Sequence, residues 1–390
     1  MQPRRFALFI LGLFLITLAS LGGAPQASAE PPLPPTAHAL LGQNENQNVE
    51  LVGQVGGYAF AVAVQGNYAY IGIGTRLHIL DVSDPAQPLL VAQSTVLPSA
   101  PNDIVVIGDY AYVAAGDVYI LDVSDPSAPT LVGSYDEPTD GTSVRMEVVG
   151  DYAFVAVSPQ WDVWGPITDT GLRILDISNP AAPMSLSFTS TEDAVDVAVA
   201  GEYAYVLDGY PRCSRYCNEG YLRIIDVSDP AAPDEVSVYT THGWSDEVEV
   251  AGDYAYVSTQ FGLETINVSD PMAPVQASFG GAGTSGRDMV IRDSRLYISE
   301  HGRVDLYSLS TPDTPTFIEG TSPEGDPNGL AVAENLVFVA SEGGGLRILD
   351  VTDPMNPVET ASYDPAGFFG QIAVAGNYAY VLDDGGLHIL

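Results

Sequence analysis

Four carboxylates occupy matching places in a repeated segment of the sequence, and they are the first candidates for chemistry. They are Asp103, Asp196, Glu247 and Asp288, each three residues before an aliphatic residue of a short apolar run. Several carboxylate oxygens in one place suit Ca²⁺, and crowded carboxyl groups acquire raised pKa values that suit general acid–base catalysis. A calcium site, an acid–base pair and a polar lining filled with water therefore stay open, and the sequence favours the last.

A second group consists of aromatic, Arg and His residues in the loops between repeated segments. An insertion at 158–170 holds Trp161 and Trp164, a second at 207–220 holds Tyr210, Arg212 and Arg215, and the next loop holds His242 and Trp244. Aromatic rings with Arg and His on exposed loops are typical of binding surfaces, here for a glycan or a peptide. The alternative is that these rings pack on one another to order the two long loops.

The two cysteines of the chain, Cys213 and Cys217, both lie in the second insertion. Outside the cell, such a pair is expected to form a local disulfide rather than a metal or redox site. The bridge would staple the loop that carries Tyr210, Arg212 and Arg215.

The elements that position these residues follow from an internal repeat of about 42 residues. In the second copy, strands are expected at 103–107, 110–114, 118–123 and 131–135, with an Asp-Pro turn before the last. Four-stranded units at this period predict an all-β propeller. The copies place their first aromatic residue, or its equivalent, at Tyr68, Tyr110, Tyr152, Tyr203, Tyr254, Arg295, Leu336 and Tyr378.

The two ends of the repeat array predict how the ring closes. The last copy stops at 387–390, in its third strand, while the segment 49–53 before the first copy resembles the fourth strand of the second copy. Pairing these two strands would complete the last blade and remove exposed sheet edges. Eight blades follow. Seven is the alternative, if the divergent sixth copy at 306–309 is misread.

The propeller fold assigns the candidate residues to two places. Loops joining the fourth strand to the next first strand, and the second strand to the third, share one face of the ring, called the top here. Both insertions belong to this face and lie over blades 3 to 5. The polar column of the first strands alternates with apolar columns, so it is expected to ring the upper channel. It reads Ala61, Asp103, Arg145, Asp196, Glu247, Asp288, Gly329 and Gln371.

The third strands resemble the motif of the LVIVD-repeat family. The matching segments are Leu77–Asp81, Val118–Asp122, Leu172–Asp176, Leu222–Asp226 and Leu346–Asp350, whereas Asn267 and Ser308 stand where the motif has Asp. The resemblance covers about 49–390 and implies a bacterial or archaeal secreted or surface propeller. It carries no catalytic residues to transfer.

The N-terminus is typical of a processing signal. Arg4 and Arg5 precede an apolar run that ends in Ala27-Ser28-Ala29, which predicts a signal peptide at 1–29. A flexible leader at 30–47 and a single propeller domain at 48–390 follow. No second apolar run of spanning length occurs, so no membrane span is expected after cleavage. A secreted or cell-surface location is expected instead.

Charge narrows the classes of partner. The formal net charge is −37, which would repel nucleic acid and anionic membranes. The sequence contains no G-x-S-x-G nucleophile elbow and no His-x-x-x-His metal pair. We therefore expect a monomeric, non-catalytic binding or scaffolding propeller whose partner is an extracellular glycan, protein or peptide. The alternative is an extracellular hydrolase or lyase that uses the carboxylates at the channel mouth.

Overall fold

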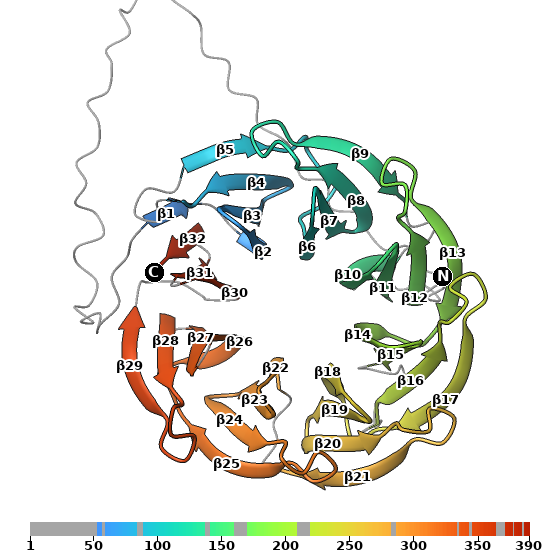
Figure 1. Cartoon of the computed structure of the whole chain (residues 1–390), viewed down its shortest axis with the longest axis vertical. Helices are drawn as coiled ribbons and strands as arrows, with labels where there is room; N and C mark the ends of the chain where they lie inside the picture. The colour runs from blue at the N-terminus through green and yellow to red at the C-terminus, as the bar shows by residue number, and fades with distance from the viewer. Residues whose placement is uncertain are drawn as a thin grey trace, which may run out of the picture. The chain divides into compact units, whose positions relative to one another are not determined.

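The protein forms a closed ring of eight four-stranded antiparallel sheets (Figure 1). The computed structural model describes residues 53–56, 59–83, 89–136, 141–159, 170–208, 219–281, 286–333, 335–342, 345–363, 371–376, 378–383 and 386–390. All of these residues belong to one compact unit. The predicted signal peptide and leader lie outside them.

Each blade runs outward from an innermost strand, a, through b and c to an outermost strand, d. The a strands of blades 1 to 8 are β2 (Ala59–Gln65), β6 (Asp103–Ile107), β10 (Gly141–Val149), β14 (Ala194–Ala200), β18 (Ser245–Ala251), β22 (Asp288–Arg292), β26 (Asp326–Ala333) and β30 (Ile372–Ala375). The b strands are β3 (Tyr68–Ile73), β7 (Tyr110–Ala115), β11 (Tyr152–Pro159), β15 (Tyr203–Asp208), β19 (Tyr254–Thr259), β23 (Arg295–Glu300), β27 (Leu336–Glu342) and β31 (Tyr378–Asp383).

The outer half of each blade has the same order. The c strands are β4 (Arg76–Asp81), β8 (Asp117–Asp122), β12 (Gly171–Asp176), β16 (Tyr221–Asp226), β20 (Gly262–Asn267), β24 (Arg303–Ser308), β28 (Gly345–Asp350) and β32 (Gly386–Ile389). The d strands are β5 (Leu89–Gln93), β9 (Thr130–Tyr135), β13 (Met184–Ser190), β17 (Asp234–Thr240), β21 (Val275–Gly280), β25 (Thr316–Thr321), β29 (Val358–Tyr363) and, in blade 8, β1 (Gly53–Gly56).

The closure of the ring confirms the predicted pairing of the N-terminal strand with the last repeat and locates the residues that form it. Strand β1 pairs antiparallel with β32, from Gly53 opposite Ile389 to Gly56 opposite Gly386. The closing strand is described at Gly53–Gly56, three residues beyond the predicted segment 49–53, whose residues 49–52 lie outside the described part of the chain. Blade 6 is complete, with β22 to β25 in one sheet, so the seven-blade alternative is wrong.

The turns between strands c and d explain how the divergent copies keep the fold. Asp122 Oδ1 accepts hydrogen bonds from the Ser124 N–H (2.9 Å) and hydroxyl (2.6 Å), which lower the pKa of this carboxyl. In blade 5, Asn267 Oδ1 accepts the Ser269 N–H at 3.0 Å. In blade 6, Ser308 Oγ accepts the Ser310 N–H at 3.2 Å. Short acceptors are interchangeable here because each closes the same local turn.

The hydrophobic core lies between neighbouring blades and not inside a single sheet. Ile174 of blade 3, for example, packs with Val197 and Val206 of blade 4. At the closing seam, Ile71 of blade 1 packs with Leu382 of blade 8. Full burial of such a side chain stabilises the fold by about 1.5–3 kcal/mol, so every seam contributes to holding the ring. Within the described part of the chain, no helix is long and apolar enough to cross a membrane.

Candidate functional site

The polar column of the a strands ties each even-numbered blade to the blade that follows it. The Met146 N–H donates to Asp103 Oδ2 (3.0 Å), the Val248 N–H to Asp196 Oδ2 (3.0 Å), the Leu330 N–H to Asp288 Oδ2 (2.6 Å) and the Val62 N–H to Gln371 Oε1 (3.2 Å). The three Asp residues that the sequence made candidates for chemistry therefore also hold the ring together.

The donor strands are prepared for this contact by irregular pairing. The register between strands a and b shifts in blades 1, 3, 5 and 7, just before each donor amide. A bulge leaves a backbone group outside the sheet ladder, and here the neighbouring blade's side chain accepts the N–H. Blade 4 carries a further shift, before Asp196. Its Val199 N–H donates to Glu147 Oε2 of blade 3 at 2.6 Å.

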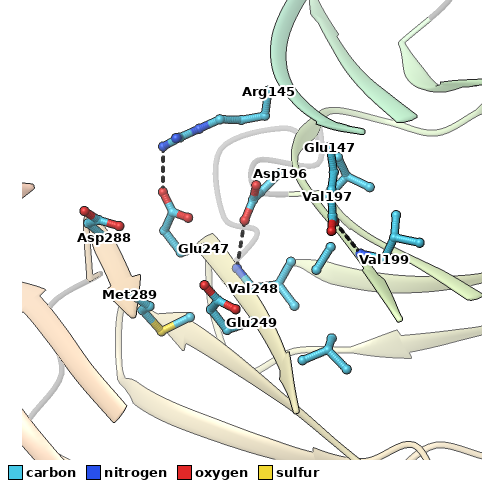
Figure 2. Close-up of a pocket in the computed structure, with 12 residues that line it drawn as sticks. Arg145, Glu147, Asp196, Val197, Val199, Glu247, Val248, Glu249, Asp288 and Met289 are labelled. Carbon is cyan, nitrogen blue, oxygen red and sulfur yellow. Dashed lines mark hydrogen bonds and ion pairs between the residues drawn. The ribbon is translucent and has the colours of Figure 1, made fainter. Parts of the chain in front are cut away.

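The channel wall at blades 3 to 6 encloses a cavity of about 330 Å³ (Figure 2). Arg145 reaches from blade 3 past blade 4, and its Nη2 lies 2.8 Å from Glu247 Oε1 of blade 5. Asp103 does not line this cavity. The polar lining residues are Arg145, Glu147, Asp196, Glu247, Glu249 and Asp288.

Burial dominates the electrostatics of this cavity. It raises the pKa of Glu247 well above its usual range, and the neighbouring Asp196 raises it further, although Arg145 opposes both effects. Burial and then Asp196 raise the pKa of Glu249 to about 7. Burial raises the pKa of Asp288 to about 6, although the hydrogen bond from the Leu330 N–H lowers it. The channel therefore holds carboxyl groups that take up protons near neutral pH.

The calcium hypothesis concerns this same wall. In the described ranges, no three His, Cys, Asp or Glu side chains come close enough together to hold a metal ion. The set Asp103, Asp196, Glu247 and Asp288 is brought to one rim of the channel, and three of its members already accept backbone amides. Calcium binding stays an open hypothesis.

The structure describes only part of the predicted aromatic arc on the top face. Its described members are His242 and Trp244, in the loop between β17 and β18. The other predicted members lie outside the described residues: Trp161, Trp164, Tyr210, Arg212, Arg215 and the cysteines Cys213 and Cys217.

The loop that carries His242 and Trp244 is held from below by a completely buried carboxylate, Glu264 of strand c in blade 5. Glu264 accepts the Tyr239 hydroxyl at 2.6 Å and the His242 N–H at 2.8 Å. Its Oε1 also lies 2.8 Å from His242 Nδ1. Since a carboxylate accepts, Nδ1 carries the proton, and Nε2 is the ring nitrogen available to a ligand.

Further contacts fix the backbone of this loop. The Gln260 N–H donates to the Trp244 carbonyl at 2.9 Å, and the Thr241 N–H donates to the Gly220 carbonyl at 2.9 Å. The buried hydroxyls of Thr241 and Ser245 lie 2.9 Å apart. Gly243 has φ +105° and abuts the Phe261 ring, so a side chain at this position would collide with it. The loop is therefore preorganised.

A depression of about 260 Å³ lies between this loop and the turn joining strands b and c of blade 5. Its walls include His242 and Phe261. The His242 ring stacks on Phe279, with ring centroids 4.8 Å apart. Phe261 is 49% exposed, and Trp244 and Phe279 are each 38% exposed. His242, Phe261 and Phe279 thus lie together at the top of blade 5, and Trp244 is exposed in the same loop as His242.

Sequence reasoning missed Phe261, Phe279 and Glu264. One signal was available for Glu264. The c strand of blade 5 departs from the repeat, and Glu264 occupies the place that Arg173 and Arg223 hold in blades 3 and 4. A carboxylate there replaces an arginine with a group that accepts hydrogen bonds, and the neighbouring loop supplies the donors.

Comparisons with known proteins agree with this architecture. A family model described as LVIVD repeat matches residues 56–95, 100–137, 140–189, 192–241, 242–278, 324–365 and 366–390, which is more than half of the chain. The unmatched stretch contains β22 to β25, so blade 6 keeps the fold while its sequence departs from the repeat. No curated protein matches the sequence.

Solved structures share the fold at low sequence identity. The computationally designed Ika8 protein has a TM-score of 0.66 at 10% identity, covering 88% of this chain and 99% of that chain. Saccharomyces cerevisiae Sqt1 has a TM-score of 0.65 at 12% identity, covering 88% and 98%. BamB from Moraxella catarrhalis has a TM-score of 0.58 at 13% identity, covering 86% and 96%. At these identities the likeness shows the propeller fold alone.

Proposed function

We propose, for a chain that belongs to the LVIVD-repeat family and forms an eight-bladed propeller, a non-catalytic binding or scaffolding role outside the cytoplasm. The ligand, a glycan or a peptide segment of a protein, binds the top face over blades 3 to 5. The signal-like sequence at 1–29 supports the extracellular location.

One observation carries this proposal: exposed aromatic rings cluster at the top of blade 5. His242 and Phe261 line one depression, Phe279 stacks on His242, and Trp244 is 38% exposed in the loop that carries His242. Large aromatic side chains in solvent are costly unless a partner covers them, and they are the residues on which binding energy concentrates.

The rigidity of the loop supports a binding role over simple packing. Glu264, Thr241 and Gln260 fix the backbone that presents His242 and Trp244. A surface that is ordered before the ligand arrives loses less conformational entropy on binding. The loop therefore has the property that a recognition surface requires.

The enzyme alternative, a hydrolase or lyase working through the channel carboxylates, has weaker support. Raised pKa values at Glu247 and Glu249 are of the kind that acid–base catalysis uses. However, Asp103, Asp196 and Asp288 each accept a backbone N–H of the next blade. This contact gives the carboxylates a structural reason to be present.

The two functions predict different losses. Binding to glycan and peptide arrays should fall at least about tenfold in Trp244→Ala and Phe261→Ala, and should be unchanged in Met272→Ala. Met272 is 72% exposed in the turn between β20 and β21 of the same blade and serves as the matched control. If Glu247→Gln and Glu249→Gln abolish turnover of an extracellular polymer while Trp244→Ala has no effect, the enzyme alternative replaces the binding role.

A further inference from the structure

We propose that the ligand of the top depression is a cationic peptide segment, whose Arg or Lys side chain lies against the aromatic rings with its charge directed to Glu219. The inference rests on the proposed binding function and adds the chemical class of the ligand. It is carried by the rings at the depression, by the exposed carboxylate of Glu219 beside them and by the strongly negative charge of the chain.

The depression has an acidic edge. Glu219 is exposed, lines the depression and pairs through an isolated bridge with Gly243, between His242 and Trp244. With a formal net charge of −37 on the whole chain, the surrounding field attracts cations and repels anions.

The aromatic rings offer the contact that a cation needs at short range. A guanidinium or ammonium group within about 6 Å of a ring centroid is attracted by the ring's negative face. Phe261 and His242 present such rings at one depression, and Phe279 stacks on His242 beside it. The protein itself makes this contact elsewhere, since the Arg173 guanidinium carbon lies 4.1 Å from the centroid of Phe188.

The arginines described in the neighbouring blades are already engaged. In blade 4, Arg223 contacts Asp208 at 2.6 Å and Glu235 at 2.9 Å. In blade 3, Arg173 lies over Phe188, and Arg145 faces the channel with Glu247. Arg223 and Arg145 thus have carboxylate partners of their own, and the proposal assigns the cation opposite Glu219 to a partner.

The test uses the mature chain and peptides of stated charge. A peptide of alternating Arg and Gly, its Gln counterpart and its Glu counterpart would be titrated by calorimetry, together with a set of neutral oligosaccharides. We expect the Arg peptide to bind, with an affinity that decreases as salt rises. Phe261→Ser and Glu219→Gln should each weaken it about tenfold or more, whereas Met272→Ser, on the opposite face of blade 5, should not.

Each contrary outcome has one meaning. Equal binding by the three single variants would show that the Arg peptide is held by net charge alone and would overturn the site. Preferred binding of the Glu peptide, drawn by Arg212 and Arg215, or of an oligosaccharide, with loss in Phe261→Ser, would overturn the cationic class and leave the binding function standing. If no probe binding responds to Phe261→Ser or Trp244→Ala, the proposed function itself fails.

Discussion

Gln371 of the last blade accepts a hydrogen bond from the backbone amide of Val62 in the first blade, at 3.2 Å and across 309 positions of sequence. This contact joins the innermost strands of blades 8 and 1, whereas the β1–β32 pairing completes blade 8 at its outer edge. The seam between the chain's ends is therefore held at two radii of the ring.

Replacing Gln371 tests the inner closure. Gln371→Ala would leave the Val62 amide without its acceptor, and the free energy of unfolding should fall by about 1–2 kcal/mol. Urea denaturation of the mature chain would measure the change. Gln65→Ala, which removes a more exposed contact to the Gly108 carbonyl, serves as the control and should cost less. A larger loss in the control would contradict a role of Gln371 in closure.

The channel carboxyls predict an unusual dependence of stability on pH. The pKa of Glu249 is raised to about 7 in the folded state, from about 4.3 in an unfolded chain. The folded state therefore holds its proton more tightly, and stability should decrease as pH rises between these two values. Asp288, with a pKa raised to about 6, acts in the same direction.

The variant Glu249→Gln separates this contribution from the rest of the protein. It keeps the shape of the side chain and removes the ionisation, so the melting temperature at mildly alkaline pH should rise above that of the parent. Below pH 4 the two proteins should melt alike. A parent protein whose stability increases steadily from pH 5 to pH 7, with Glu249→Gln following it, would contradict the expectation.

For two tyrosines, Tyr307 and Tyr239, opposite results are expected from the same Tyr→Phe substitution. The Tyr307 hydroxyl has no hydrogen-bond partner and the residue is 3% exposed, so Tyr307→Phe should leave stability unchanged or raise it. The Tyr239 hydroxyl donates to Glu264 at 2.6 Å, so Tyr239→Phe should lower the free energy of unfolding by about 1–3 kcal/mol. Equal losses in both would show that an ordered water serves the Tyr307 hydroxyl.

Calcium binding is open to a direct measurement. Because Asp103, Asp196 and Asp288 accept backbone amides, we expect calorimetry to detect no tight calcium binding and EDTA to leave the melting curve unchanged. Binding of one ion that is lost in Asp196→Asn would contradict this and would place a cation at the channel.

The sequence was informative where the repeat expresses a local rule. The Gly-Asp turns, the Asp-Pro turns and the paired ends predicted four-stranded blades and their closure. Asn267 and Ser308 looked like breaks in the motif, but their short acceptors close the same turns as Asp122. The number of blades could therefore be counted correctly through the divergent copies.

Contacts between blades were beyond the reach of that reasoning. The column containing Asp103, Asp196 and Asp288 was located correctly. The hydrogen bonds from the amides of Met146, Val248 and Leu330 depend on β-bulges, which cannot be predicted from a single sequence. The residues close to His242 were missed for a similar reason. Phe261 and Phe279 lie in a turn and an outer strand, and only the curvature of the blade brings them to the same depression.

The alternation of side-chain acceptors and amide donors in the polar column requires an even number of blades. In the polar column, acceptors stand on blades 2, 4, 6 and 8, and their donors on blades 3, 5, 7 and 1. The bond from Val199 of blade 4 to Glu147 of blade 3 lies outside this column. An odd-membered ring of the same units would be frustrated, with two like blades meeting at one seam. Repeats in such a chain are therefore expected to be gained or lost two at a time. A pair of adjacent blades is the smallest unit whose addition or removal preserves every donor–acceptor contact of the polar column.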